Sequence, residues 1–448
     1  MLYPIQNEKR NKLDLSGIWD FKTDPGVIGE QEGWALGLEN SRPMAVPGSW
    51  NTQYEDLFSY LDLAWYVNKV YIPSGWKGQR VVIRVGSACY FGTVYVNGVK
   101  VGEHEGGHLP FAFEITDYVK WDQENVIAIS VENELKPTRV PSGNIASSMG
   151  AFVTTPRTTF DFYPFAGIHR PVVLYSLPQT FIEDVLVETD IEGSDGKVKI
   201  KVQLNNADAG KGKAVLSAGS QEMTAVLNFS EGYAVVDMLV PDPHLWSDKD
   251  PFSYNLDIFT DEDHYSLKVG IRTIEVQDGK ILLNGKPVKL NGYGRHEDFF
   301  ASGKGLNEPL IVKDYQLMRW TGANAYRTSH YPYSEEEMMM ADREGFLVID
   351  EIPAVSLQFD NKENMAERMH MCLQQIDEMI ARDKNHPSVV LWCVSNEAMP
   401  RKSDMATLGQ PFDDSDHPED KAFLDKLLLY AKEKDATRPV TLVAIMGS

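Results

Sequence analysis

The most informative candidate for chemistry in this sequence is an acid that follows a long apolar run. Residues 389–394 read VVLWCV, and one serine later come Asn396 and Glu397. If the run is a buried strand, the carboxyl group at its end lies beside low-dielectric surroundings, and these raise its pKa. A carboxyl group that keeps its proton near neutral pH can act as a general acid toward a departing oxygen. The same pattern also fits a glutamate that caps the next helix or pairs with an arginine.

Polar groups end three earlier apolar segments as well, at Arg295–Asp298, Arg327–His330 and Asp350–Glu351. Neutral imidazoles and carboxylates offer directional donors and acceptors, which suits the recognition of hydroxyl groups. A structural network of ion pairs beneath a pocket is the alternative for three of these side chains, Arg327, Glu297 and Asp298.

Metal binding is the other chemistry that these residue types allow. His296, Glu297 and His330 carry possible ligand groups, but their spacing matches no zinc motif. The chain has three cysteines at widely separated positions, which is neither a disulfide framework nor a zinc site. We therefore expect no metal and no cofactor.

The elements that must position these residues alternate between apolar β runs and helical periods after about Ile274. Such alternation is typical of a buried parallel sheet with right-handed crossovers. Five β units could form an open doubly wound sheet or part of a (β/α)8 barrel. Clustered polar strand ends and the lack of a Gly-rich nucleotide fingerprint favour the barrel. We expect its strands at about 288–295, 323–329, 346–352, 388–396 and 439–445.

Two β-rich segments precede the barrel. Short alternating runs separated by Gly, Pro and Asn predict an antiparallel sandwich over residues 1–178, and its size favours a jelly roll. Asn97–Gly98 is the strongest hairpin signal in this part of the chain. Residues 179–273 have the strand spacing and size of an immunoglobulin-like sandwich. We thus expect three domains, with residues 274–448 forming the N-terminal part of a TIM barrel.

Composition excludes several classes of partner. The 448 residues include 43 Lys and Arg against 65 Asp and Glu, for a net charge of −22. So acidic a chain does not suit a nucleic-acid backbone or an anionic membrane surface. No apolar run is long enough to span a bilayer, and the N-terminus lacks an apolar signal-peptide region. With its few cysteines, the chain is expected in a reducing compartment such as the cytoplasm.

Two long segments carry a family resemblance. Residues 383–397 read DKNHPSVVLWCVSNE and resemble the acid/base signature of glycoside hydrolase family 2. Residues 324–349 resemble the other signature of that family. Residues 292–298 (GYGRHED) and 161–170 (DFYPFAGIHR) are more similar to β-glucuronidases than to β-galactosidases or β-mannosidases. The likeness covers essentially the whole chain in domain order.

The resemblance implies a retaining exo-glycosidase that hydrolyses β-D-glucuronides, with Glu397 as general acid and base. The residues that it implies for substrate binding are Asp161, His296, Glu297, His330 and Asn396. The residues that it implies in supporting positions are Arg295, Asp298, Arg327, Tyr331 and Trp392. Left open are a family-2 β-galactosidase or other exo-glycosidase, and a non-catalytic carbohydrate-binding homologue.

Several positions need a separate interpretation. Trp392 and Tyr331 could stack on sugar, although the depth of Trp392 in its strand favours core packing. Cys393 and Glu337 depart from the signatures; we expect the thiol to pack in the core and Glu337 to face solvent. For His169–Arg170 we expect a structural role at a strand end.

The second acid of the mechanism is expected outside the chain. Retaining glycosidases need a nucleophilic carboxylate besides the acid/base. In the family it lies on the seventh barrel strand, whereas this sequence shows five β units. We therefore expect the nucleophile in a region after Ser448. The chain is then either a fragment of a longer enzyme or a natural truncation without hydrolase activity, and we expect another segment to complete the barrel in the functional protein. Family members are commonly homo-oligomers, so we also expect self-association.

Overall fold

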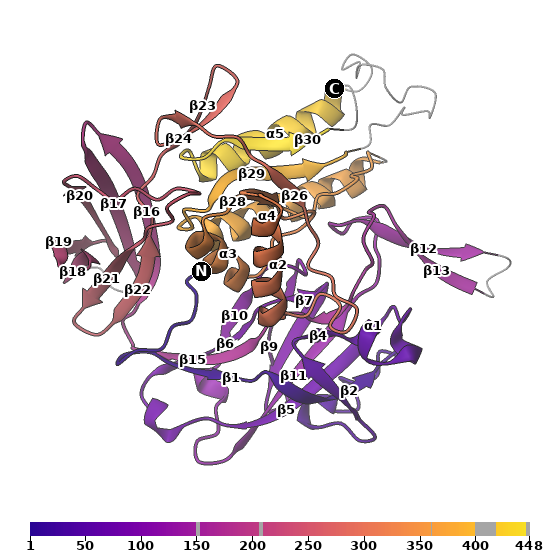
Figure 1. Cartoon of the computed structure of the whole chain (residues 1–448). Coiled ribbons are helices and arrows are strands. Elements are labelled where there is room, and N and C mark those ends of the chain that lie inside the picture. Colours follow the sequence, from indigo (N-terminus) through magenta and orange to yellow (C-terminus); the bar gives the residue numbers. More distant parts are fainter. Residues whose placement is uncertain (149–152, 206–208, 360, 399–417, 445–448) are drawn as a thin grey trace, which may run out of the picture.

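The computed structural model describes residues 1–148, 153–205, 209–359, 361–398 and 418–444. Figure 1 shows three bodies: a large β-sandwich at the bottom, a smaller β unit at the left, and a layer of parallel strands and helices at the top. Among the described helices, none is long and apolar enough to cross a membrane.

The first body packs a four-stranded and a six-stranded antiparallel sheet face to face. In β2 the side chains alternate, so that Trp19 and Phe21 are buried while Ile18 and Asp20 are exposed. The four-stranded sheet has the order β1 (Asn11–Asp14), β15 (Val172–Leu177), β6 (Arg80–Val85), β10 (Phe111–Glu114). The six-stranded sheet has the order β3 (Arg42–Val46), β2 (Gly17–Thr23), β5 (Leu63–Tyr71), β11 (Glu124–Glu132), β8 (Phe91–Val96), β9 (Val99–Glu105).

The predicted hairpin at Asn97–Gly98 is confirmed. Val96 pairs with Val99 across the turn, and both turn residues have positive φ, 52° and 86°. This backbone matches the right-handed twist of the flanking strands. The smaller elements of this body are α1 (Trp50–Gln53), a three-stranded sheet of β4 (Gly48–Ser49), β14 (Gly167–Ile168) and β7 (Ala88–Cys89), and a hairpin of β12 (Gly143–Ser148) and β13 (Val153–Thr158).

The second body is a seven-stranded antiparallel sheet that folds around its own core. In β17 the residues Val198, Ile200 and Val202 are buried, while Lys199 and Lys201 between them are exposed. In sheet order the strands are β16 (Ile182–Glu192), β17 (Asp195–Leu204), β20 (Tyr233–Val240), β19 (Gln221–Ser230), β18 (Ala209–Ala218), β21 (Tyr254–Thr260) and β22 (His264–Val269).

The third body contains a five-stranded sheet in which every adjacent pair is parallel. Each strand lies within the range predicted for it. The strands are β26 (Gly292–Gly294), β27 (Ala325–Arg327), β28 (Leu347–Glu351), β29 (Val389–Asn396) and β30 (Val440–Val443). A small antiparallel sheet leads into them, made of β23 (Ile274–Gln277), β24 (Lys280–Leu283) and β25 (Lys286–Pro287).

Helices alternate with these strands, as the periodicity predicts: α2 (Glu308–Trp320), α3 (Glu335–Glu344), α4 (Lys362–Asp383) and α5 (Pro418–Lys434). Three of them begin at a side-chain cap, in which Asn307, Ser334 and Asn361 accept hydrogen bonds from backbone N–H groups of the first turn. Gly345 ends α3 with a φ of 73°, a left-handed conformation that favours glycine.

The sandwich and the parallel layer share one hydrophobic core. Leu109, Phe160 and Phe162 of the sandwich belong to the same buried cluster as Tyr331 and Trp392 of the third body. Because this contact is apolar and continuous, it fixes the loop around Phe162 against the carboxyl ends of the parallel strands.

Candidate active site

Arg327 links the carboxyl ends of two neighbouring strands. It is the last residue of the short strand β27, and its Nε lies 3.4 Å from Oε2 of Glu351 at the end of β28. Its Nη2 donates to Oδ1 of Asn396, at the end of β29, over 3.3 Å. The resemblance implied a supporting position for Arg327, and these contacts fit such a position.

Glu351 fixes the orientation of His330. The glutamate side chain is fully buried, and its Oε1 lies 2.7 Å from Nδ1 of His330. The backbone N–H of Glu351 donates to Oγ1 of Thr328, which holds the end of the strand. Because Nδ1 is bonded to this carboxylate, Nε2 is the nitrogen of His330 that remains on the opposite side of the ring.

Asp161 and His296 lie on the Nε2 side of His330. Oδ1 of Asp161 is 3.9 Å from Nε2 of His330, and the Asp161 side chain is 75% exposed. The rings of His296 and His330 lie edge to face at 5.7 Å. Burial lowers the pKa of His296, so its ring is neutral at pH 7. The structure thus brings together three predicted substrate-binding residues from two bodies of the fold.

This group is also the set of described residues that comes nearest to a cation site. Ligand atoms of Asp161, His296 and His330 all lie within 4.8 Å of one another. The set differs from the one considered from sequence, because Asp161 takes the place of Glu297.

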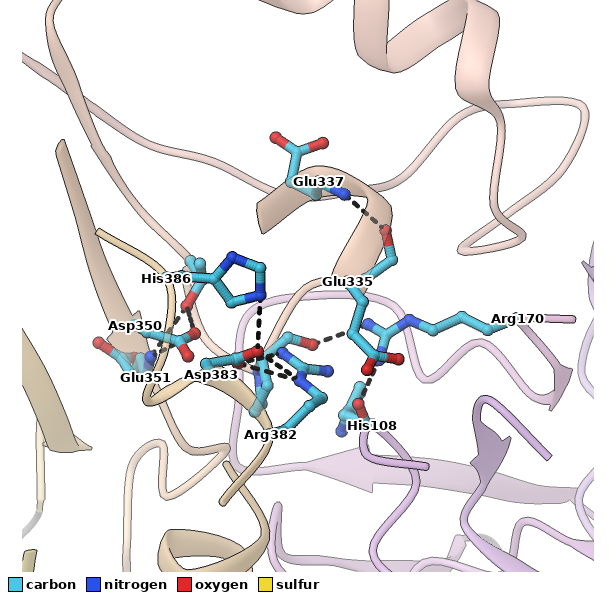
Figure 2. Close-up of polar contacts among 12 residues, drawn as sticks. His108, Arg170, Glu335, Glu337, Asp350, Glu351, Arg382, Asp383 and His386 are labelled. Carbon is cyan, nitrogen blue, oxygen red and sulfur yellow. Dashed lines mark hydrogen bonds and ion pairs between the residues drawn. The ribbon is translucent and has the colours of Figure 1, made fainter. Parts of the chain in front are cut away.

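Glu297 does not belong to this group and contacts other residues. Its Oε2 lies 3.3 Å from Nη2 of Arg170, and its Oε1 accepts a hydrogen bond from the backbone N–H of Ser334. Arg170 also donates to the backbone carbonyl of His108 (Figure 2) and to that of Pro332. Glu297 therefore belongs to an ion-pair network between the sandwich and the third body, the alternative that the sequence left open.

Tyr331 is buried inside this interface. Its side chain is 0% exposed, its hydroxyl donates to Asp298, and the ring of His108 stacks on it at 4.6 Å. Trp392 is likewise 0% exposed, and its Nε1 donates to Asp435. Neither ring offers a free face to a sugar, so stacking by Tyr331 is not supported and core packing of Trp392 is confirmed.

Asn396 and Glu397 differ in burial although they are adjacent. Asn396 is buried at the end of β29, whereas Glu397 is exposed and has a φ of 48°. This left-handed turn lifts Glu397 out of the sheet, and its backbone N–H donates to the carbonyl of Val443. The prediction that Glu397 is buried at the end of the strand is therefore wrong. Among the described residues, none forms an ion pair with it, so a tight arginine pair is not its role there.

Arg295, directly after β26, is held by acids of the helices α2 and α3. Arg295 pairs with Asp314 of α2 at 2.8 Å and with Glu337 of α3, and its guanidinium lies 5.2 Å from the ring centre of Tyr326. Glu337 is only 1% exposed, so the prediction that it faces solvent is wrong. Burial raises its pKa, and Arg295 opposes that effect.

Comparison with known proteins matches the chain along its whole length. The model of the family 2 sugar-binding domain matches residues 12–178, the family 2 middle domain matches residues 180–272, and the family 2 TIM barrel domain matches residues 274–447. The chain belongs to glycoside hydrolase family 2. It therefore has the family's architecture of a sugar-binding domain, an immunoglobulin-like domain and a TIM-barrel domain, as predicted from sequence.

Individual members of family 2 are similar over nearly the entire chain. Beta-glucuronidase of Sus scrofa is 36% identical over 480 residues, which cover 99% of this chain and 70% of that protein. The solved structure of an uncultured Clostridium sp. beta-glucuronidase has a TM-score of 0.88 and 36% identity, covering 99% and 74% of the two chains. A Ruminococcus gnavus enzyme in complex with C6-substituted uronic isofagomine matches with a TM-score of 0.88 and 33% identity, covering 98% and 73%.

A buried polar network that the sequence did not reveal joins β28 to the end of α4. Asp350 accepts a hydrogen bond from Thr328, and burial together with the neighbouring Asp383 raises its pKa well above the usual range. Arg382 pairs with Asp383 at 2.5 Å (Figure 2). His386, which Figure 2 also shows, pairs through Nδ1 with Asp342 at 2.6 Å. The signal was available, because Asp383 and His386 belong to the signature that contains Glu397.

Proposed function

We propose that the chain hydrolyses β-D-glucuronides as a retaining exo-glycosidase, with Glu397 as general acid and base. The observation that carries this proposal is a line of contacts along one sheet edge, from Asn396 through Arg327 and Glu351 to His330. Relatives that are 36% identical over 99% of the chain bear the name beta-glucuronidase. A carboxylic acid beside directional hydroxyl-binding groups fits glycoside cleavage.

In this mechanism Glu397 acts twice. Its carboxyl form donates a proton to the glycosidic oxygen while the bond from the anomeric carbon to that oxygen breaks, and the bonding electrons leave with the oxygen. Its carboxylate form then takes a proton from the water that attacks the anomeric carbon. The exposed position of Glu397 leaves the carboxyl group open to substrate.

The other residues bind and orient the sugar. Asn396 is held by Arg327, so its amide nitrogen is available for the sugar 2-hydroxyl group, where contacts strengthen as positive charge develops. Nε2 of His330 and the exposed carboxylate of Asp161 provide a donor or acceptor pair for further hydroxyls. His296 lies beside them as a neutral ring.

The nucleophile is a second carboxylate, which we place on a segment that completes the barrel. The described part of the chain has five parallel strands, against eight in a full barrel. Glu351 ends one of them but is already held by His330 and Arg327. Among the described strands β26 and β30 are the edges of this sheet, and covering them would also protect them from non-specific pairing.

Self-association and location belong to the same proposal. We place the enzyme in the cytoplasm as a homo-oligomer; all three cysteines are free and buried, which fits a reducing compartment. Size measurement by light scattering tests the oligomer, and a monomer at all concentrations would contradict it.

Substrate class is tested by turnover of p-nitrophenyl β-D-glucuronide against the matching β-D-galactoside, with the chain alone and with a barrel-completing segment. The proposal predicts hydrolysis of the glucuronide in preference, and activity that depends on the second carboxylate. Preference for the galactoside would support the alternative exo-glycosidase. Sugar binding without turnover, in the presence of that segment, would support a non-catalytic carbohydrate-binding protein.

A further inference from the structure

A cavity of about 420 Å³ lies between the immunoglobulin-like domain and the barrel. Its walls come from β16, β17, the stretch from the end of β22 to the start of β23, the turn after α4 and the turn before β30. Hydrogen bonds close it on one side, because Asn385 accepts from the backbone N–H of Val187 and donates to the carbonyl of Val185. The cavity is therefore a built feature of the domain junction.

This cavity lies far along the sheet from the proposed active site. Pro387 and Arg438 in its wall come just before β29 and β30, at the amino ends of these parallel strands. Glu397 follows the carboxyl end of β29. In barrels the chemistry takes place at the carboxyl ends, so the cavity is separate from it.

The charge of the cavity wall is opposite to that of the whole chain. Five cationic side chains line it against three acids, Glu188, Asp190 and Glu275, while the chain carries a net charge of −22. Three of the cations are already paired: Lys199 with Glu188, Lys384 with Asp184, and Arg438 with Asp435.

The remaining two cations, Arg272 and Lys197, form no ion pair with any described residue. Lys197 stands opposite Asp190 in the strand pairing, yet the two side chains do not reach ion-pair distance. Arg272 is 5% exposed, and it donates through Nε to the carbonyl of Pro387 and through Nη2 to the carbonyl of Val389. Within the described part of the chain, its Nη1 has no partner.

A buried guanidinium without an acid partner is costly, because carbonyl dipoles offset only part of its desolvation. Burial lowers the pKa of Arg272 to about 9, so it still carries its charge at neutral pH. An anion in the cavity would remove this cost, and a planar guanidinium recognises tetrahedral oxyanions well.

We propose that this junction cavity binds an oxyanion of the phosphate class, held by Nη1 of Arg272 and the ammonium group of Lys197. Free phosphate and a phosphate monoester share this chemistry, and the cavity has room for an ester. The ligand would join the immunoglobulin-like domain to the barrel, since one cation precedes β23 and the other belongs to β17.

The test is thermal unfolding of the whole chain in sodium phosphate or glycerol phosphate, compared with sodium chloride at matched ionic strength. A ligand that binds only the native state raises the midpoint with concentration. We expect such a rise for the wild type. Lys197→Glu should weaken the apparent affinity at least tenfold. Lys201→Glu is the matched control, because Lys201 is exposed on the same face of β17 outside the cavity.

Each outcome either supports or overturns the proposed oxyanion site. A shift in both anions that Lys197→Glu loses and Lys201→Glu keeps supports the site, and a shift with glycerol phosphate alone identifies an ester as ligand. No shift beyond chloride, an equal shift in Lys197→Glu, or an equal loss in the control would overturn it. Glucuronide turnover should be unchanged in Lys197→Glu, which separates this test from the proposed function.

Discussion

The pair of Glu351 and His330 is the feature that most clearly sets the geometry of the site. The carboxylate is fully buried and reaches the imidazole at 2.7 Å. In the proposed function it would act through the histidine, so we regard it as a positioning residue.

Glu351→Gln tests that role. The amide no longer fixes the proton on Nδ1, so His330 loses its orientation toward the sugar. We expect kcat/KM for glucuronides to fall by about 10²-fold, as misplacement of a binding group produces. Steady-state kinetics measure this, with Glu363→Gln on the exposed first turn of α4 as control. An unchanged kcat/KM, with the fold intact by circular dichroism, would show that Glu351 is only structural.

Lys304 is a second unusual residue of the domain interface. It is 4% exposed, its Nζ has no hydrogen-bond partner among the described residues, and it lies 3.7 Å from the ring centre of Tyr331 and 4.0 Å from that of Phe162. Burial lowers its pKa to about 8, from an ordinary value of 10.5. Between these two values the unfolded chain binds more protons, so stability rises with pH across that window.

Lys304→Met should therefore stabilise the protein at pH 7. The change removes a buried charge worth about 3 kcal/mol, less the ring contacts, which leaves a gain of about 1–3 kcal/mol. The variant should also lose most of the rise in unfolding free energy between pH 8 and 10.5. Urea unfolding at pH 7 and pH 10 measures both effects, with the exposed Lys313→Met as control. A loss of stability at pH 7 would contradict the account.

From sequence alone, candidate residues could be named more readily than their surroundings. Asn396 and Glu397 were singled out because an apolar run ends at them and because the signature surrounds them. The exposure of Glu397 could not be found, since it depends on one left-handed backbone angle. The burial of Glu337 depends on Arg295, a partner 42 positions away in sequence.

At the scale of elements, the ion pair between Arg295 and Glu337 fastens α3 to the end of β26. Both groups are nearly buried, with side chains 11% and 2% exposed. Removing one partner leaves the other charge in a poorly solvated site, which costs more than losing an exposed pair.

Glu337→Ala should lower the free energy of unfolding by about 3–5 kcal/mol. Glu344→Ala on the same helix is the control, because its pair with Arg319 is more exposed and is worth about 0–1 kcal/mol. Denaturant unfolding of both variants gives the comparison. Equal losses would mean that the buried pair contributes no more than a surface one.

The elements themselves could largely be predicted from periodicity. All five parallel strands lie within their predicted ranges. The clearest signal is that of β29, which is buried along its whole length and begins with six apolar residues, as a strand covered on both faces does. The first range began too early: Val288 donates to the carbonyl of Ile281 and so extends the small antiparallel sheet before β26. The hydrophobic pattern alone does not reveal with which neighbouring strand a short segment pairs.

At the scale of the whole molecule, the site depends on two bodies meeting. The sandwich contributes Asp161, and the third body contributes His296 and His330. Their shared core, with Phe162 against Tyr331 at 5.2 Å, holds them together. Long-range packing of this kind has no local sequence signal, so only the family resemblance grouped Asp161 with His296 and His330, beside which it lies.

The most direct test of the account is the leaving-group dependence of Glu397→Gln, assayed in the catalytically active form of the protein. If Glu397 protonates the glycosidic oxygen, kcat/KM for phenyl β-D-glucuronide should fall by about 10²–10⁴-fold, because phenolate leaves poorly without a proton. The value for p-nitrophenyl β-D-glucuronide should change far less, since that leaving group needs little help. An equal loss for both substrates, or no loss for either, would contradict the role given to Glu397.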